Sequence, residues 1–297
     1  MTPIKIRVLR HSAFYSPLLL TMAAGYLAEQ GLAPEYDVAT PEKTVEDGIA
    51  QGIVQVAQSA VAASFSELAH TGQCSVRHFA QINERDGFFL TAREPTRSEF
   101  DWHDLMGKPL LIDHFFQPLA MFRYALHKKG INFNELDVID AGDVAQIDAA
   151  YRAGQGAFVH QQGPYAQQLE ADGLGMVVAC VGDVLGPVAF SSLCAAPDWL
   201  ETDMARAFKQ AYRKGREASR AMPAAEIAQL EAGFFPEIDR DVLTATIQSY
   251  QSLGCWEGDD TISRSAYENV LDIFEFSGVI QQRYDYSALI SAPSEKA

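Results

Sequence analysis

The chain has 297 residues, 48% of them hydrophobic, so it is long enough to bury one large core or two medium ones. Its 39 acidic residues outnumber 23 basic ones and give a net charge of −16, which disfavours nucleic acid and anionic membrane surfaces as partners. No apolar run reaches the roughly 18 residues of a membrane span, so direct insertion into a membrane is not expected.

The first part of the chain alternates between strand and helix patterns. Strands are predicted at 4–10, 35–39, 53–58 and 75–84, and helices at 17–30, 43–51 and 62–71. This alternation is typical of parallel sheets with right-handed crossovers. An extended segment at 87–94 follows.

The same alternation then returns. Strands are predicted at 109–113, 136–140, 156–160 and 175–181, and helices at 118–129, 144–153 and 164–171. Each module opens with a short apolar run, a histidine (His11, His114) and a proline (Pro17, Pro118) that suits the first turn of a helix. Two related modules predict two lobes with a cleft between them.

The last third has a different pattern. After a second extended segment at 186–195, the periodicity up to residue 282 is almost entirely helical. We therefore predict an α/β fold in which two α/β lobes are joined by two hinge crossings and followed by a helical C-terminal third. The expected boundaries place residues 1–90 and 188–297 in the first lobe and residues 91–187 in an inserted second lobe.

Open parallel sheets bind their ligands beyond the carboxyl ends of the strands. The residues predicted at these ends are mostly aromatic, amide and imidazole groups, with almost no fixed charge. Such a lining suits a small, planar organic solute that stacks on rings and bonds to amides. The predicted ligand-binding residues are His11, Phe14, Tyr15, Gln58, Ser59, His114, Phe115, Gln117, His160, Gln161, Tyr165 and Ser191.

Three of these residues, His11, His114 and His160, leave a second function open. Converging imidazoles hold Zn²⁺ or Fe²⁺, or act as acid and base near neutral pH. The helical H-x-x-x-H spacing, the G-x-S-x-G elbow and the phosphate-binding glycine loops are absent from the sequence. We therefore favour hydrogen bonding to a ligand and predict no metal and no cofactor.

Three segments share a family pattern: SPLLLTMAAGYLAEQGLAPEYDVAT (16–40), FDWHDLMGKPLLID (100–113) and AYRAGQGAFVHQQGPYAQQLEADG (150–173). They resemble the SsuA/THI5-like (NMT1-like) family over about residues 4–195. The resemblance implies a type II periplasmic-binding-protein fold whose lobes close on a small molecule. It also implies the membrane subunits of an ABC importer as partners if the protein is exported.

Two enzymatic branches of that family are not matched. Gln58 and Ala62 look like the places where thiamine-pyrimidine synthases carry a lysine and a histidine, and Ala13 stands where sulfinate desulfinases carry a nucleophilic cysteine. A cytosolic enzyme that uses the cleft histidines on a thiamine-pyrimidine-like, sulfonate or aromatic compound stays the alternative to binding.

The chain begins directly with a strand pattern and shows no secretory signal. As the sequence stands we expect a cytoplasmic location, and a periplasmic one if the N-terminus has been trimmed.

Overall fold

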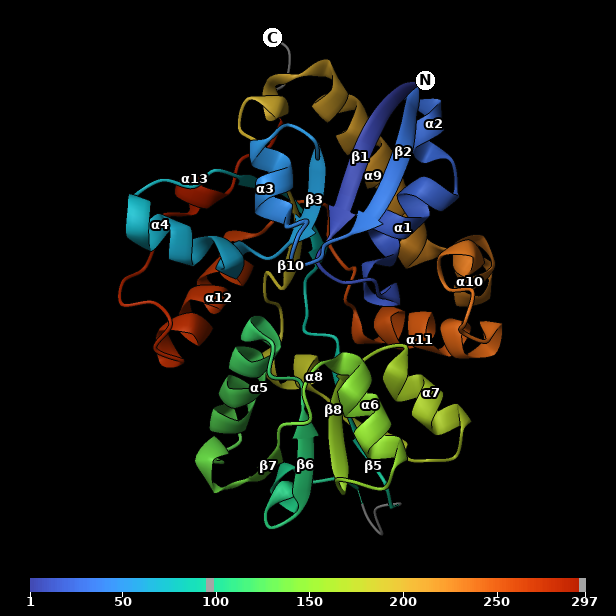
Figure 1. Ribbon diagram of the computed structural model, residues 1–297, viewed down its shortest axis with the longest axis vertical. Helices are drawn as coiled ribbons and strands as arrows, with labels where there is room; N and C mark the ends of the chain where they lie inside the picture. Colours follow the sequence, from blue (N-terminus) through green and yellow to red (C-terminus); the bar gives the residue numbers. More distant parts are fainter. Residues whose placement is uncertain (95–98, 294–297) are drawn as a thin grey trace.

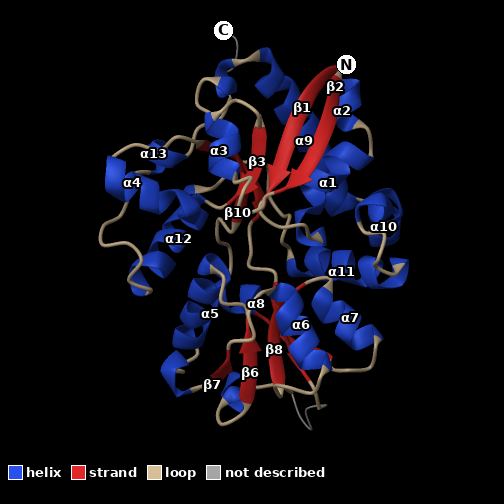
Figure 2. Cartoon of the chain, viewed as in Figure 1, coloured by secondary structure: helices blue, strands red, loops and turns tan. Residues whose placement is uncertain are grey.

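The computed structural model describes residues 1–94 and 99–293, and in it the chain forms two lobes, one above the other in Figure 1. Each lobe contains a five-stranded sheet with helices packed against it (Figure 2). The predicted α/β class with two lobes is confirmed. Residues 95–98 of the expected second lobe and residues 294–297 lie outside the described part.

The two sheets have the same topology. The first has the order β2-β1-β3-β10-β4, built from β1 (Thr2–Val8), β2 (Leu32–Val38), β3 (Val56–Ser59), β4 (Arg77–Asn83) and β10 (Ser191–Ala195). The second has the order β7-β6-β8-β5-β9, built from β5 (Phe88–Ala92), β6 (Pro109–Ile112), β7 (Asp137–Ile139), β8 (Phe158–Gln162) and β9 (Met176–Cys180). In each, the second strand, β1 or β6, pairs in parallel with both of its neighbours, while β10 or β5 runs antiparallel to the two strands beside it. The repeat in the sequence therefore corresponds to a repeat in the fold.

The two crossing segments end as strands of the opposite sheet. β5 follows β4 along the chain but pairs with β8 and β9, and β10 returns to pair with β3 and β4. The expected boundary after residue 90 cuts through β5, whose two ladders hold it firmly in the second sheet. The first crossing itself is the short segment 84–87. In the second, α8 (Val181–Leu185) precedes the expected extended segment at 186–195, and that segment is a loop up to residue 190 and a strand only over β10.

Helices cover both lobes, and the helical C-terminal third is confirmed. The first lobe carries α1 (Ser16–Ala23), α2 (Tyr26–Glu29), α3 (Val45–Ala50), α4 (Phe65–Thr71), α9 (Asp203–Ala221), α10 (Ala224–Glu231), α11 (Arg240–Leu253), α12 (Arg264–Phe276) and α13 (Tyr286–Leu289). The second carries α5 (Phe116–Lys128), α6 (Val144–Arg152), α7 (Tyr165–Ala171) and α8. Short 3₁₀ turns lie at η1 (Ala13–Tyr15), η2 (Val61–Ser64), η3 (Trp102–Leu105), η4 (Phe133–Glu135), η5 (Trp199–Glu201) and η6 (Ala232–Phe234). Because α11 contacts α7 and α12 contacts α5, the C-terminal helices touch both lobes.

The helix predicted over 17–30 is wrong in one respect, because it is interrupted. Gly25 has a φ of 78°, a left-handed conformation that ends α1 and starts the separate short α2. Glycine adopts this conformation without the steric cost that a Cβ brings.

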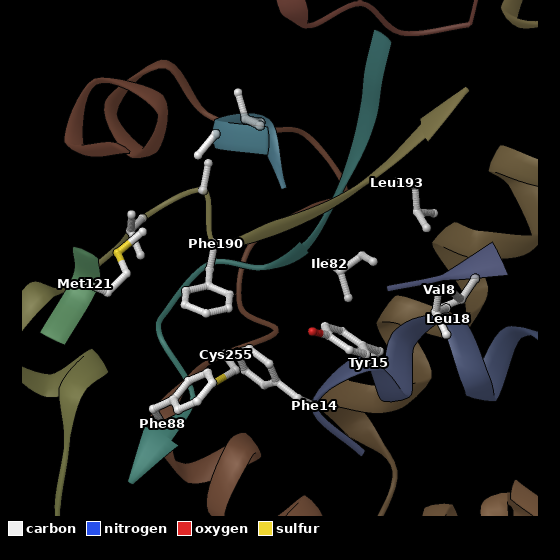
Figure 3. Close-up of a cluster of buried hydrophobic side chains, with 14 of the residues drawn as sticks. Val8, Phe14, Tyr15, Leu18, Ile82, Phe88, Met121, Phe190, Leu193 and Cys255 are labelled. Carbon is white, nitrogen blue, oxygen red and sulfur yellow. The ribbon is translucent and has the colours of Figure 1, made fainter. Parts of the chain in front are cut away.

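A buried aromatic cluster lies where the crossings pass between the lobes. Figure 3 shows Phe14, Phe88 and Phe190 gathered there, and the ring centroids of Phe14 and Phe190 are 5.4 Å apart. Phe14 is fully buried, so it is a core residue rather than the ligand contact we predicted. In the described part of the chain, no helix is long and apolar enough to cross a membrane.

Candidate functional site

A narrow cavity lies between the lobes, at the carboxyl ends of β1, β3, β6 and β8. A volume of about 50 Å³ within it is open to the centres of water molecules. Its walls come from both lobes: Leu9, Arg10, Tyr15, Gln58, Ala60, Phe88, Phe115, Gln117, Pro118, Gln162, Phe190 and Ser191. This is the end of the strands where open α/β sheets bind ligands.

Five of the residues predicted from the sequence line this cavity. They are Tyr15, Gln58, Phe115, Gln117 and Ser191, which come from both modules and from β10. The loops at the ends of β1, β3, β6 and β8 therefore do lie around one common gap.

Three other predicted residues are placed elsewhere on the strands or helices. Ser59 is buried in the β3–β10 ladder, opposite Ser192. Gln161 is buried and lies one position before the residue that lines the cavity, Gln162. Successive side chains of a strand point to opposite faces, so an error of one residue in the prediction assigns the wrong amide to the cavity. Tyr165 opens α7 and is half-buried outside the cavity lining.

His11 is held by the first lobe, away from the cavity walls. Its Nε2 donates to the carbonyl oxygen of Phe234 (2.7 Å), so in the neutral ring its Nδ1 accepts from the Tyr36 hydroxyl (2.8 Å). Burial lowers the pKa of His11, although the bond to Phe234 opposes that shift. The ring is therefore neutral and structurally engaged near neutral pH.

The other two histidines do not line the cavity either. His160 on β8 is fully buried and stacked between Phe88 and Phe122, with centroid distances of 4.8 and 4.6 Å. Neither of its ring nitrogens has a hydrogen-bond partner among the described residues. Burial lowers the pKa of His160 to about 4, against the opposing charge of Asp113. The His114 side chain is 30% exposed, with its Nδ1 3.5 Å from Asp140 Oδ1.

The three histidines do not form a metal centre. Within residues 1–94 and 99–293, no group of three or more His, Cys, Asp or Glu side chains is arranged to hold an ion. The four cysteines are buried free thiols.

The lining carries a fixed charge that we did not predict. Arg10, just after β1, forms two bonds to Asp113, just after β6, with Nη1–Oδ2 and Nη2–Oδ1 distances of 2.7 and 3.2 Å. Only 21% of the Arg10 side chain and 6% of the Asp113 side chain are exposed. Burial raises the pKa of Asp113, but the bonds and charge of Arg10 outweigh burial and make the net shift downward. A largely buried ion pair, one member of which lines the cavity, therefore joins the two lobes.

A second polar contact joins the lobes beside the first. The Ser12 hydroxyl donates to the Gly163 carbonyl, and the Gly163 N–H donates to the Tyr250 hydroxyl, both at 2.8 Å. The lobes are thus closed on each other around the narrow cavity.

Several amides of the cavity have unused hydrogen-bonding capacity. Gln117 donates its Nε2–H to the Phe190 carbonyl, whereas its Oε1 has no partner within the described part of the chain. The Nε2 of Gln162 is also buried without a partner among those residues. Buried polar atoms are normally satisfied by protein, water or ligand, so these two atoms are available to water or to a guest in the cavity.

Another hollow, wider and more open, lies on the surface of the first lobe. Its lining includes Pro3, Lys5 and Gln55, at the start of β1 and beside it, and Trp199. This is the amino end of the parallel strands, opposite to the end that binds ligands in such sheets. We therefore assign the site to the cavity between the lobes.

The fold is the two-lobed fold of the periplasmic-binding-protein type. Residues 13–226 match the family described as NMT1/THI5 like, and the chain belongs to that family. It is 28% identical over 298 residues to "Putative binding protein YtlA" of Bacillus subtilis, covering 98% of this chain and 88% of that one.

Solved structures show the same fold at low sequence identity. The ligand-binding component of an ABC-type import system from Staphylococcus aureus aligns with a TM-score of 0.76 at 17% identity, over 98% of this chain and 97% of that one. The periplasmic aliphatic sulphonate binding protein SsuA from Escherichia coli aligns with a TM-score of 0.74 at 14% identity, over 100% of this chain and 94% of that one.

Proposed function

We propose that this chain binds a small, flat organic solute between its lobes, as the solute-binding component of an ABC import system. The observation that carries the proposal is the cavity itself, which collects aromatic rings and unpaired amides from the strand ends of both lobes. Sites of this composition suit small organic ligands, since rings supply contact area and a few polar groups fix orientation.

The walls supply complementary chemistry for such a solute. Phe115, which is 53% exposed, and Phe88 both belong to the lining, so a flat ring has apolar surface to lie against. Gln117 offers an acceptor and Gln162 a donor, each buried and each unused by the described protein. A ligand that carries both a hydrogen-bond donor and an acceptor would satisfy them.

Family membership supports a partner as well as a ligand. The solved relatives named above include a ligand-binding component of an import system and a periplasmic sulphonate-binding protein. By analogy we propose the membrane subunits of an ABC importer as partners, and a periplasmic location, if this protein is exported. A cytoplasmic member of the family would bind the same class of solute without those subunits.

The enzymatic alternative has less support. It relied on one or more of His11, His114 and His160 as cleft histidines, and none of the three belongs to the cavity lining. We therefore favour binding without turnover.

The test is a binding screen with a matched pair of variants. Purified protein is titrated with pyrimidines, sulfonates and aromatic acids, and saturable thermal stabilisation is followed by calorimetry and by recovery of the compound. Phe115→Ala is expected to weaken binding at least about tenfold, since it removes a ring of the wall. Phe276→Ala, at an equally exposed phenylalanine on α12 outside this cavity, is the control and should leave affinity unchanged.

Two outcomes would contradict the proposal. One is equal affinity in Phe115→Ala and wild type, which would place the ligand elsewhere. The other is chemical conversion of the compound, which would move the protein to the enzymatic alternative.

A further inference from the structure

The ion pair between Arg10 and Asp113 constrains what the cavity can accept. Arg10 belongs to the first lobe and Asp113 to the second, so their two hydrogen bonds span the cleft. Asp113 also accepts the Phe115 N–H at 2.9 Å, and the Arg10 guanidinium lies 4.9 Å from the centroid of the Phe115 ring. Arg10 is therefore part of the cavity wall, beside the ring we assign to ligand stacking, and Asp113 is bonded both to Arg10 and to the backbone of Phe115.

The cavity is small in this closed arrangement of the lobes. Its volume of about 50 Å³ open to the centres of water molecules is well below the roughly 300–1,000 Å³ of typical small-molecule pockets. A ligand with one ring enters only if the lobes move apart. Since the two members of the pair lie on different lobes, that movement separates guanidinium from carboxylate.

Separated charges in a largely buried cavity need new partners. Breaking a buried ion pair is costly because each member keeps its desolvation penalty without its counter-charge. A monoanionic ligand compensates Arg10 and leaves Asp113 unpaired, and a monocation does the reverse. A neutral ligand leaves both unpaired. Only a ligand with both charges replaces the two halves of the pair.

We propose, resting on the binding function above, that the ligand is a zwitterion whose anionic group replaces Asp113 at Arg10 and whose protonated nitrogen replaces Arg10 at Asp113. Its flat body lies along Phe115. Two buried amide atoms without a partner among the described residues suit such a ligand. The Gln162 N–H can donate to its anionic group, and the Gln117 Oε1 can accept from its protonated nitrogen. Arg10 and Asp113 are then the residues that determine the charge class of the ligand.

The test compares four compounds with one ring shape and different charges. The probes are 4-(aminomethyl)benzoate (zwitterion), 4-methylbenzoate (anion), 4-methylbenzylamine (cation) and 4-methylbenzamide (neutral), titrated by calorimetry into wild type, Asp113→Asn and Arg10→Gln. Wild type is expected to bind the zwitterion at least about tenfold more tightly than the other three. Asp113→Asn should shift the preference by a similar factor toward the anion, and Arg10→Gln toward the cation.

Lys214→Gln is the control variant, because it breaks an exposed ion pair with Glu29 far from the cavity. It is expected to keep the wild-type order of affinities. The wild-type order is itself decisive, so the test does not depend on how well the cleft variants fold.

The outcomes separate this inference from the function on which it rests. Binding of the anion, the cation or the neutral amide as tightly as the zwitterion by wild type overturns the inference alone. An unchanged preference in both folded cleft variants does the same. If none of the probes binds saturably to any of the four proteins, both the inference and the proposed function, binding of a small aromatic solute, are overturned.

Discussion

Asp86 provides a quantitative test of how the crossing between the lobes is held. It lies in the segment 84–87, is fully buried, and accepts the Phe88 N–H on its Oδ1 at 2.7 Å. Its Oδ2 has no partner among the residues that the structure describes. Burial raises the pKa of Asp86 to about 8, against the bond from Phe88, and the charge of Asp113 adds to the rise. The folded protein therefore keeps this carboxyl protonated at neutral pH.

The sign of the pH effect follows from proton linkage. Below about pH 4 the Asp86 carboxyl is protonated in both the folded and the unfolded chain, so its titration does not change the free energy of unfolding. Between about pH 4 and pH 8 the unfolded chain loses the proton that the folded chain retains, and the free energy of unfolding falls as pH rises. With about 1.4 kcal/mol for each pKa unit, the cost at pH 7 is at most about 4 kcal/mol.

Asp86→Asn removes this titration and keeps the shape of the side chain. We expect the variant to gain stability over wild type as pH rises from 5 to 8, by about 2–4 kcal/mol at the upper end. The nearby thiols of Cys180 and Cys255 do not interfere, because burial raises their pKa well above this range. The measurement is urea unfolding of both proteins across the pH series.

The control is Asp183→Asn, which removes one negative charge from the exposed surface of α8. Effects of net charge appear in both variants, whereas the steep pH dependence should appear in Asp86→Asn alone. A difference between Asp86→Asn and wild type that is constant from pH 5 to pH 8 would refute the reasoning.

Three further substitutions test the packing around the cleft by thermal unfolding. His160→Phe keeps a stacked ring and removes two unsatisfied polar atoms, so it should be neutral or stabilise by up to about 2 kcal/mol; a clear loss would mean that the imidazole has a partner. Gly87→Ala should cost about 1–3 kcal/mol, because its Cβ would lie 2.7 Å from Cδ2 and Cζ of Phe14, whereas Gly233→Ala, with nothing within 4 Å, should be neutral. Trp256→Phe should cost about 1–3 kcal/mol, because the indole N–H donates to a buried asparagine and to the Phe14 carbonyl; equal stability would show that those acceptors find other donors.

The fold was largely predictable because its signals are local. Alternating strand and helix periods, with proline at helix starts and glycine at helix ends, mark both modules, and the structure gives them identical sheet orders. The crossing strands were less predictable. The sequence around Phe88–Ala92 indicates an extended segment, but which sheet it joins depends on ladders to β8 and β9, made with residues about 70 to 90 positions away.

The site was predicted less completely, for two physical reasons. The first is register, since the alternation of side chains along β8 decides whether Gln161 or Gln162 faces the cavity. The second is burial. Phe14 and His160 lie at predicted strand ends, as the residues that line the cavity do. Both nevertheless pack into aromatic clusters that form only when segments distant in the sequence meet.

The charged pair in the wall shows how a repeat can carry information about a site. Arg10 directly precedes His11, and Asp113 directly precedes His114, so the two charges occupy equivalent positions in the two modules. Equivalent strand ends face each other across the cleft, and opposite charges at such positions are therefore expected to meet. The composition of the chain gives no indication of this ion pair, because one arginine and one aspartate add nothing to the net charge. A comparison of the modules position by position is the signal that could have found the pair, which we did not predict and which the structure shows.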